Sequence, residues 1–326
     1  MLVITAPGQG AQTPGFLSPW LDVPGVAEQL TGWSDLAGID LIRCGTTGTE
    51  AEIKDTAVAQ PLLVASALAA ATALFQEAPL EGLPASGPGL ATAGHSVGEL
   101  AAGAIAGVLS PADALRLVAV RGRAMAAASA ITATGMTAVL GGDEKEVLAS
   151  LEAHGLAPAN INATGQVVAA GTLDQLAAFA ADPPPKARLR PLSVAGAFHT
   201  EHMAPAVDAL RTAAATVTVS DPRIVLLSDL DGAVVTTGDD WLDRIVGQVA
   251  RPVRWDECQH TLADRGVQAL IELPPAGTLT GIARRALPGV TTLAVKSPDD
   301  LDTARKLIAE FGSDAGPAPV DPTEGS

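Results

Sequence analysis

The stretch that decides the fold is LATAGHSVGELAAGAIAGVL, residues 90–109. Its first residues, 90–93, form a short apolar run that predicts a strand, and residues 99–109 are small and apolar, which predicts a helix. Between them, Gly94-His95-Ser96-Val97-Gly98 fits the G-x-S-x-G pattern, in which a strand turns sharply into a helix and leaves a serine hydroxyl exposed at the helix N-terminus. Such a turn packs tightly, so it needs glycine on both sides. The stretch therefore predicts an α/β fold with Ser96 as a candidate nucleophile; the alternative is that Ser96 only caps an ordinary strand-to-helix turn.

Strand and helix alternate on both sides of this stretch. Residues 2–6 predict a buried strand that stops at the tight loop Pro7-Gly8-Gln9-Gly10, a type of loop that often lines a ligand site. Such alternation is typical of an α/β core with a parallel sheet. The other predicted elements of the core are helices at 61–75, 110–128, from about 203, 241–246 and 301–311, and strands at 224–228 and 268–273.

Residues 129–195 have a different pattern, which predicts an inserted unit. Strand, helix, strand, helix and strand follow one another there, and a further strand is expected near 159–163; this order is typical of a ferredoxin-like subdomain. We therefore expect a core formed by residues 1–128 and 196–311, an insert at 129–195, a Pro/Gly linker at 80–89 and a disordered tail at 312–326. The strands expected in the insert lie at 136–140, 166–170 and 188–194, and its helices at 143–154 and 173–181.

Composition and net charge exclude some classes of function. The 326 residues are 48% apolar and 17% charged, which is enough for a large core, and their formal charge is −16. An acidic surface repels phosphate backbones and anionic lipid, so general nucleic-acid or membrane-surface binding is not expected, and an anionic ligand must meet a local basic pocket. No signal peptide or membrane span is predicted. The two cysteines suit a reducing compartment, so we expect a cytoplasmic protein.

A serine nucleophile needs a base, and one histidine is well placed to be that base. His199 directly follows a predicted strand, where α/β enzymes place site residues; the alternative is a structural histidine. His199 and His202 could together bind a metal, but no third ligand lies at a suitable spacing, so no metal site is expected. Gly8-Gln9-Gly10 lacks the third glycine of a dinucleotide fingerprint, because Thr13 stands there, so no cofactor is expected.

Arg121 is the most informative charged residue. Its neighbours three and four positions away along the predicted helix are all apolar, which places its guanidinium on a buried stripe. A buried guanidinium is costly unless an anion meets it, and its fork matches a carboxylate in two hydrogen bonds. Arg121 is therefore a candidate carboxylate binder; the alternatives are that it extends to solvent or pairs with an internal acid.

Six motifs, in order, resemble those of the malonyl-CoA:acyl carrier protein transacylases over residues 2–308. Two positions depart from the family pattern: the loop at 273–277 reads LPPAG where Gly-Pro-Gly is usual, and Ala197 stands where Pro is common. The motifs are Gly8-Gln9-Gly10-Ala11-Gln12, Gly94-His95-Ser96-Val97-Gly98-Glu99, Arg121-Gly122-Arg123-Ala124-Met125, Ala159-Asn160-Ile161-Asn162, Gly196-Ala197-Phe198-His199-Thr200 and Gln248-Val249-Ala250-Arg251-Pro252-Val253-Arg254-Trp255.

The resemblance implies an α/β-hydrolase-like core with an inserted ferredoxin-like subdomain. It implies that Ser96 is the nucleophile and His199 the base, and that Gln248 orients the histidine. It further implies an oxyanion hole made by the backbone N–H groups of Gln9 and Val97. The same resemblance gives the substrate-binding residues: Arg121 for the malonyl carboxylate, Phe198, which is similar to malonyl-selective members, and Asn160.

The implied activity is the transfer of a malonyl group from malonyl-CoA to the phosphopantetheine thiol of acyl carrier protein, through a Ser96 ester. CoA and phosphopantetheine thioesters are then substrates, and the enzyme is expected to be a monomer in fatty acid or polyketide biosynthesis. Because carrier proteins of this kind are acidic, docking is expected on a local basic rim formed by Lys186, Arg188, Arg190, Arg284 and Arg285. A serine thioesterase or esterase and a non-catalytic carrier-protein-binding module remain the alternatives.

Overall fold

The computed structural model of the chain describes residues 1–75, 89–194 and 196–312. The linker predicted at 80–89 lies outside these residues apart from Gly89, and the predicted disordered tail lies outside them apart from Gly312.

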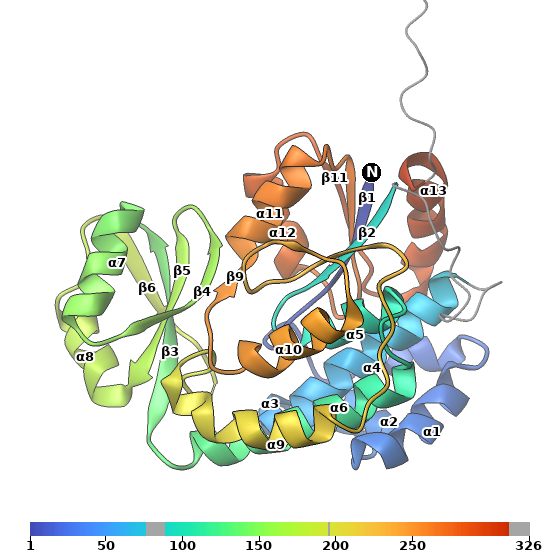
Figure 1. Cartoon of the computed structure of the whole chain (residues 1–326), viewed down its shortest axis with the longest axis horizontal. Coiled ribbons are helices and arrows are strands. Elements are labelled where there is room, and N and C mark those ends of the chain that lie inside the picture. The colour runs from blue at the N-terminus through green and yellow to red at the C-terminus, as the bar shows by residue number, and fades with distance from the viewer. Residues whose placement is uncertain (76–88, 195, 313–326) are drawn as a thin grey trace, which may run out of the picture.

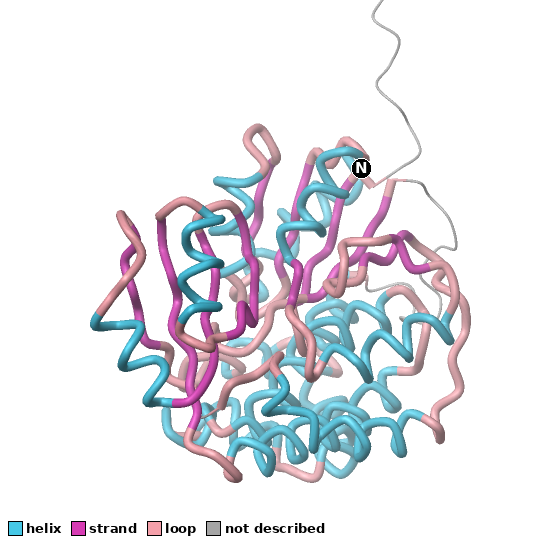
Figure 2. Tube along the Cα trace, turned by 60° about the vertical axis from the view of Figure 1, so that its left-hand side comes forward, coloured by secondary structure: helices cyan, strands magenta, loops and turns pink. Residues whose placement is uncertain are grey.

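A six-stranded sheet forms the centre of the larger part of the fold (Figures 1 and 2). Its order is β11-β10-β1-β2-β7-β8, and neighbouring strands run parallel except β8, which is antiparallel to β7. Ala6 at the end of β1 lies opposite Gly94 at the end of β2, so the loops that follow these two strands meet at one edge of the sheet. The strands are β1 Leu2–Ala6, β2 Leu90–Gly94, β7 Val225–Leu227, β8 Val234–Val235, β10 Ala269–Glu272 and β11 Thr291–Ala294.

Helices cover both faces of this sheet. Alternate residues of a strand point to opposite faces: Leu2 and Ile4 of β1 join the core cluster of α4, α5 and α6, whereas Val3 packs with residues of α11 and α12. The predicted α/β core with a parallel sheet is confirmed. The helices of this part are α1 Val26–Ala37, α2 Leu41–Thr47, α3 Glu50–Lys54, α4 Thr56–Leu74, α5 Gly98–Ile105, α6 Pro111–Ser129, α9 Ala204–Ala214, α10 Gly238–Gln248, α11 Trp255–Asp264, α12 Thr278–Ala286 and α13 Leu301–Phe311, with short 3-10 turns at Ser18–Asp22, Glu201–Met203 and Pro298–Asp300.

The central helix α4 differs from its prediction. It begins at Thr56 rather than at Pro61, because the Asp55 side chain accepts the N–H of Ala57 and caps the helix one turn earlier. Among the described residues, α4 is the one helix long and apolar enough to cross a membrane, but 83% of that stretch is buried inside the protein. It is packed against α5 and α6, so α4 is a core helix.

A second, five-stranded sheet stands beside the first, at the left of Figure 1. Its order is β6-β3-β5-β4-β9. The four strands of the insert pair antiparallel with one another, and both helices lie between strands as in a ferredoxin-like unit. The fifth strand, β9, comes from the core segment and pairs with β4, so the sheet takes one strand from beyond residues 129–195. The elements are β3 Thr134–Gly141, α7 Glu144–Ala153, β4 Ala157–Ala163, β5 Gln166–Thr172, α8 Leu173–Ala181, β6 Ala187–Pro191 and β9 Val253–Arg254.

Candidate active site

Ser96 sits on a strained turn between β2 and α5. Its φ of 52° lies in the left-handed region, which a residue with a side chain rarely adopts. A Cβ on Gly94 would lie 2.1 Å from the backbone nitrogen of Glu99, and one on Gly98 would lie 2.2 Å from the carbonyl oxygen of Ala6. The tight packing expected of both glycines is therefore present, and it holds the Ser96 hydroxyl at the edge of the sheet.

His199 meets Ser96 from the other side of the site. The two residues are 103 positions apart in sequence, and Ser96 Oγ lies 2.7 Å from His199 Nε2. On its other nitrogen, His199 Nδ1 lies 2.9 Å from the main-chain oxygen of Gln248, a contact that requires a proton on Nδ1 and leaves Nε2 as the acceptor. Burial, reinforced by the positive charge of Arg121, lowers the pKa of His199 to about 3, so the imidazole is neutral at pH 7. This is the geometry and protonation state that a general base needs.

Two backbone N–H groups close to this pair have no hydrogen-bond partner among the described residues. Within the part of the chain that the structure describes, neither Gln9 N nor Val97 N donates a hydrogen bond to the protein. Val97 precedes the first turn of α5, where the helix dipole favours negative charge, and Gln9 lies in the loop after β1. By contrast, the Ser96 N–H is already occupied by Asp229 at 2.6 Å. The two free groups are thus able to bind an oxyanion.

Arg121 is buried beside the nucleophile with only neutral partners. It is 1% exposed, and Nη1 donates to Gln60 Oε1 at 2.7 Å. Its Nη2 donates to Gln248 Oε1 at 2.8 Å and to Ser96 Oγ at 3.2 Å. Burial lowers the pKa of Arg121 to about 10, which still leaves it charged at pH 7. No carboxylate forms an ion pair with it among the described residues, so the alternative of an internal acid partner is not observed.

Gln248 makes contacts in the site with both its main-chain carbonyl and its side-chain amide. Its main-chain carbonyl, rather than its side chain, contacts His199. The side-chain amide instead lies between Arg121 and the turn that carries Ser96. Its Nε2 lies 3.1 Å from the carbonyl oxygen of Ser96 and 3.0 Å from Asp229 Oδ1, and it is in short contact with Glu99 Oε2. The amide therefore connects the carboxylate binder to the turn that carries the nucleophile.

Sequence reasoning missed the two acids behind this turn. Glu99 is 1% exposed and Asp229 is fully buried, and Glu99 Oε1 accepts the Asp229 N–H at 2.7 Å. Burial raises the pKa of both carboxyl groups, and the charge of Asp229 raises the pKa of Glu99 further. Glu99 ends the motif that contains Ser96, but Asp229 lies 130 positions further on, beyond β7, and no local pattern marks it.

A cavity of about 270 Å³ opens above Ser96 and His199, between the core and the insert. Phe198 and Asn160 line it, as predicted for substrate-binding residues, and each is largely buried. Arg121 does not line this cavity; its guanidinium lies behind Ser96 Oγ. To pair with Arg121, a carboxylate bound in this cavity would have to replace the contact between Arg121 and the Ser96 hydroxyl.

The atypical loop at 273–277 is fixed by one buried acid. Glu272, at the end of β10, accepts hydrogen bonds from the backbone N–H groups of Gly277, Leu279 and Thr280 and from the Thr280 hydroxyl, at 2.8 to 2.9 Å. This carboxylate holds the start of α12, whose residues Thr278 and Leu279 line the cavity. Although the loop at 273–277 departs from the Gly-Pro-Gly pattern, this side of the cavity is therefore held in a defined position.

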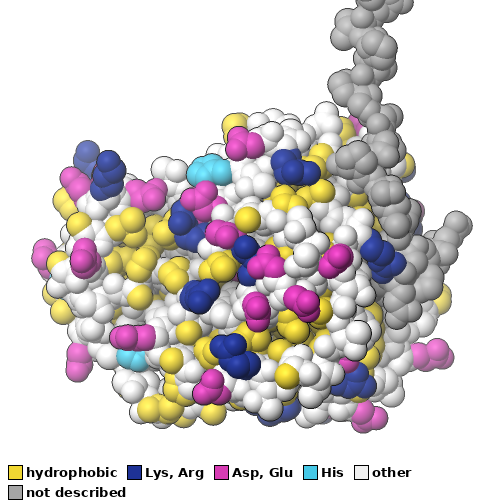
Figure 3. Space-filling model, viewed as in Figure 1, with side chains coloured by type: hydrophobic (Ala, Val, Ile, Leu, Met, Phe, Trp, Pro, Cys, Tyr) yellow, Lys and Arg dark blue, Asp and Glu magenta, His cyan; other side chains and the backbone are white. Residues whose placement is uncertain are grey.

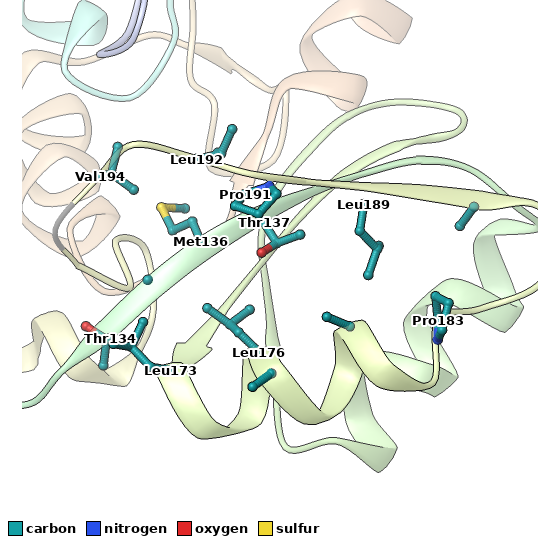
Figure 4. A pocket seen from close by; sticks show the side chains of 14 residues that line it. Thr134, Met136, Thr137, Leu173, Leu176, Pro183, Leu189, Pro191, Leu192 and Val194 are labelled. Carbon is teal, nitrogen blue, oxygen red and sulfur yellow. The ribbon is translucent and has the colours of Figure 1, made fainter.

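A second hollow, of about 570 Å³, lies on the insert between α8 and strands β3 and β6. Figure 4 shows Leu176 of α8 pointing toward Met136 and Thr137 of β3, while Leu173 lies beside Thr134 and Leu189 lies to the upper right of Leu176. It is apolar and contains none of the predicted catalytic residues. It shares Met136 and Leu192 with the cavity above Ser96, so the two hollows adjoin.

No group of three or more His, Cys, Asp or Glu side chains that could hold a metal occurs among the described residues. The ring of His199 is occupied by Ser96 and Gln248, so the pair with His202 is not arranged for a metal.

Known proteins resemble the chain over nearly its whole length. Residues 22–302 match the acyl transferase domain family. Over 307 residues the chain is 54% identical to a protein of Mycobacterium tuberculosis (strain ATCC 25618 / H37Rv) named malonyl CoA-acyl carrier protein transacylase; the match covers 94% of this chain and 100% of that protein.

Solved structures give the same picture. A crystal structure of MCAT from Mycobacterium tuberculosis superposes with a TM-score of 0.89 at 54% identity and covers 94% of this chain and 99% of that one. A holo complex of a malonyl-transacylase with its type II PKS acyl-carrier protein gives a TM-score of 0.85 at 29% identity, over 94% of this chain and 99% of the transacylase chain.

Proposed function

The chain belongs to the acyl transferase domain family, among the malonyl CoA-acyl carrier protein transacylases, and we propose that it moves the malonyl group through an ester on Ser96. The observation that carries this proposal is the position of Arg121: a buried, unpaired guanidinium 3.2 Å from the hydroxyl that contacts the neutral His199. A site that combines a nucleophile, a base and a carboxylate binder suits an acyl group that ends in a carboxylate.

In the first half of the reaction, His199 Nε2 takes the proton of Ser96 Oγ as this oxygen attacks the malonyl thioester carbonyl. The oxyanion that forms is bound by the N–H groups of Gln9 and Val97. The C–S bond then breaks, His199 returns the proton to the departing CoA sulfur, and the malonyl group remains as a serine ester.

In the second half, the phosphopantetheine thiol of the carrier protein enters the same cavity. His199 takes the thiol proton, the sulfur attacks the ester carbonyl, and the proton passes back to Ser96 Oγ as the ester bond breaks. Arg121 holds the malonyl carboxylate throughout, which keeps the ester in place for the thiol and selects a diacid over an uncharged acyl group. Phe198 and Asn160 line the space around the acyl chain.

The proposal extends to the setting of the enzyme. We expect a cytoplasmic monomer that uses no cofactor and serves fatty acid biosynthesis, with a polyketide carrier protein as the other acceptor to test. The reducing compartment is supported by the two cysteines, Cys44 and Cys258, which are both buried and unpaired.

The alternatives require a different site. A thioesterase that sends the acyl group to water has no use for a buried cation beside the serine, and a binding module has no chemical need for a 2.7 Å contact between serine and histidine. Both observations favour the transferase.

Intact-protein mass spectrometry tests this function. After brief mixing with malonyl-CoA, the protein is expected to gain one malonyl group, to lose it when holo-carrier protein is added, and to gain none as Ser96→Ala. Arg121→Ala should form the malonyl ester about a hundredfold more slowly, because it loses a two-pronged, charge-assisted contact, while acetyl-CoA becomes a better competitor. Steady hydrolysis of malonyl-CoA without an adduct would instead establish a thioesterase, and no adduct with no turnover would leave the binding module.

A further inference from the structure

The mechanism above assigns no role to the buried acids Glu99 and Asp229, although they lie next to the turn that carries the nucleophile. They belong to different segments, α5 and the turn after β7, and they meet around a single side chain, Gln248. Asp229 Oδ2 also accepts the backbone N–H of Ser96, so this pair holds the turn on which the nucleophile sits.

The orientation of the Gln248 amide is fixed by Arg121. A guanidinium can only donate, so the atom of Gln248 that lies 2.8 Å from Arg121 Nη2 has to be the oxygen. The amide nitrogen therefore faces the acids.

Counting hydrogens shows how the two acids share this amide. Gln248 Nε2 carries two hydrogens and lies near three acceptors: the carbonyl oxygen of Ser96, Oε2 of Glu99 and Oδ1 of Asp229. The Ser96 oxygen also accepts the backbone N–H of Glu99, so the two amide hydrogens can serve the two acids. If both acids were ionised, however, two negative charges would share one dry site, which is costly. One additional proton on a carboxyl group removes this cost.

The position of that proton follows from the nearby charges. Each of the two carboxyl groups accepts one backbone N–H and the Gln248 amide, so the number of donors does not distinguish them. The charge of Arg121 favours the ionised form of Asp229. The charge of Asp229 in turn favours a neutral Glu99. The remaining titratable group that faces the pair is Cys258, a buried thiol that carries no charge at pH 7 because burial raises its pKa.

We propose that Glu99 is a protonated carboxylic acid at neutral pH, hydrogen-bonded to an ionised Asp229, and that this pair is a positioning device for acyl transfer. The single negative charge balances Arg121 through Gln248 without contacting it, so the guanidinium stays available for the malonyl carboxylate. The pair also occupies the Ser96 N–H and thereby leaves the oxyanion to Gln9 and Val97. The proposal rests on the proposed function in one respect only, that Ser96 is the nucleophile.

Infrared spectroscopy of the whole protein at pH 7 tests the protonation directly. Subtracting the spectrum of Glu99→Gln from that of the unmodified protein should reveal one protonated-carboxyl C=O band that shifts in D₂O. The matched control is Glu257→Gln, which alters a partly exposed carboxylate paired with Arg254 and should change carboxylate bands only. Carboxylate bands in the Glu99 difference spectrum, or a carboxyl band that disappears only in Asp229→Asn, would overturn the assignment.

Ester formation tests the positioning role. Glu99→Gln still offers a donor to Asp229, so it should acylate about tenfold faster than Glu99→Ala, with the difference in kcat rather than KM. Asp229→Asn, which removes the charge, should be slower than Glu99→Gln. Equal rates for the two Glu99 variants, once corrected for the folded fraction, would contradict the proposal. A protein that forms no ester but keeps the infrared band would refute the proposed function and leave the shared proton standing.

Discussion

At the scale of single residues, the chemistry depends on a histidine that the fold keeps neutral. His199 is 3% exposed and lies close enough to Arg121 for that charge to lower its pKa. The unfolded chain binds a proton below the ordinary pKa of 6.5, whereas the folded chain does so only near pH 3. The contribution of His199 to the unfolding free energy should therefore fall as the pH drops from about 6.5 toward 3, because the unfolded state then binds the additional proton.

We predict that lowering the pH from 7 to 5 in urea unfolding changes the unfolding free energy more favourably for the folded state in His199→Gln than in the unmodified protein, because the variant lacks the His199 contribution. The lowered pKa of His95 acts in the same direction as that of His199, whereas the raised pKa values of Glu99 and Asp229 act in the opposite direction in both proteins. In the same pH range, kcat/KM for ester formation should decline little, since the base is still neutral. An acid limb centred near pH 6.5 would show that His199 titrates as an exposed histidine and would contradict the buried environment.

The site residues that were predicted from sequence are marked by their neighbours in the sequence, whereas the missed ones are marked only by contacts between distant segments. Ser96 and His199 each stand at the end of a predicted strand, and Arg121 stands out because its helical neighbours are apolar. Asp229 gives no such local signal: it follows a strand of three residues and becomes informative only when Ser96 and Gln248 are brought against it. Likewise, the use of the Gln248 main chain rather than its side chain follows from backbone geometry, which residue type does not reveal.

At the scale of elements, the helix that carries Arg121 is fixed by its cap. The sequence predicts a helix at 110–128; in the structure α6 begins at Pro111, and the side chain of Ser110 before it accepts the N–H of Asp113 at 3.1 Å. Ser110→Ala should lower the unfolding free energy by about 1 kcal/mol, the usual effect of losing such a cap. Selectivity for malonyl over acetyl should be unchanged, because α6 remains packed against α4 and α9. Denaturant titration and the ester assay measure the two quantities; a loss of selectivity without a loss of stability would contradict this account.

Elements with strong local patterns were predicted well, and those without them were missed. Helices 173–181 and 301–311 match α8 and α13 at both ends. The helices α1 to α3, α11 and α12 were not predicted. Nor were the two-residue strands β8 and β9 and the edge strand β11, because pairing partners far away in sequence define these strands. The contribution of β9 to the small sheet is of this kind, since only the tertiary fold brings it beside β4.

At the scale of the whole molecule, an enzyme with a formal charge of −16 must attract an acidic carrier protein over a short range. Figure 3 shows basic and acidic side chains interspersed on one face rather than in a single basic field. Along β6, Arg190 lies opposite Ala138, which lines the cavity, and Arg188 lies opposite Leu140; since opposite residues of an antiparallel pair share a face, both arginines lie on the cavity side of the sheet. Arg285 reaches the same rim, where it donates to Gln166 at 2.7 Å, whereas Arg284 turns to Thr292 on β11.

We therefore predict that the double charge reversal of Arg188 and Arg190 to Glu raises KM for holo-carrier protein about tenfold at low salt, with a smaller effect at high salt, and leaves ester formation from malonyl-CoA intact. Lys306→Glu is the control: it makes the same change per residue on α13, at the opposite end of the molecule from the insert (Figure 1). Discharge of the preformed malonyl ester, measured against carrier concentration at two salt concentrations, separates docking from chemistry. If the reversed protein and the Lys306 control discharge alike, the carrier does not approach over β6, and the rim near Arg285 becomes the surface to vary next.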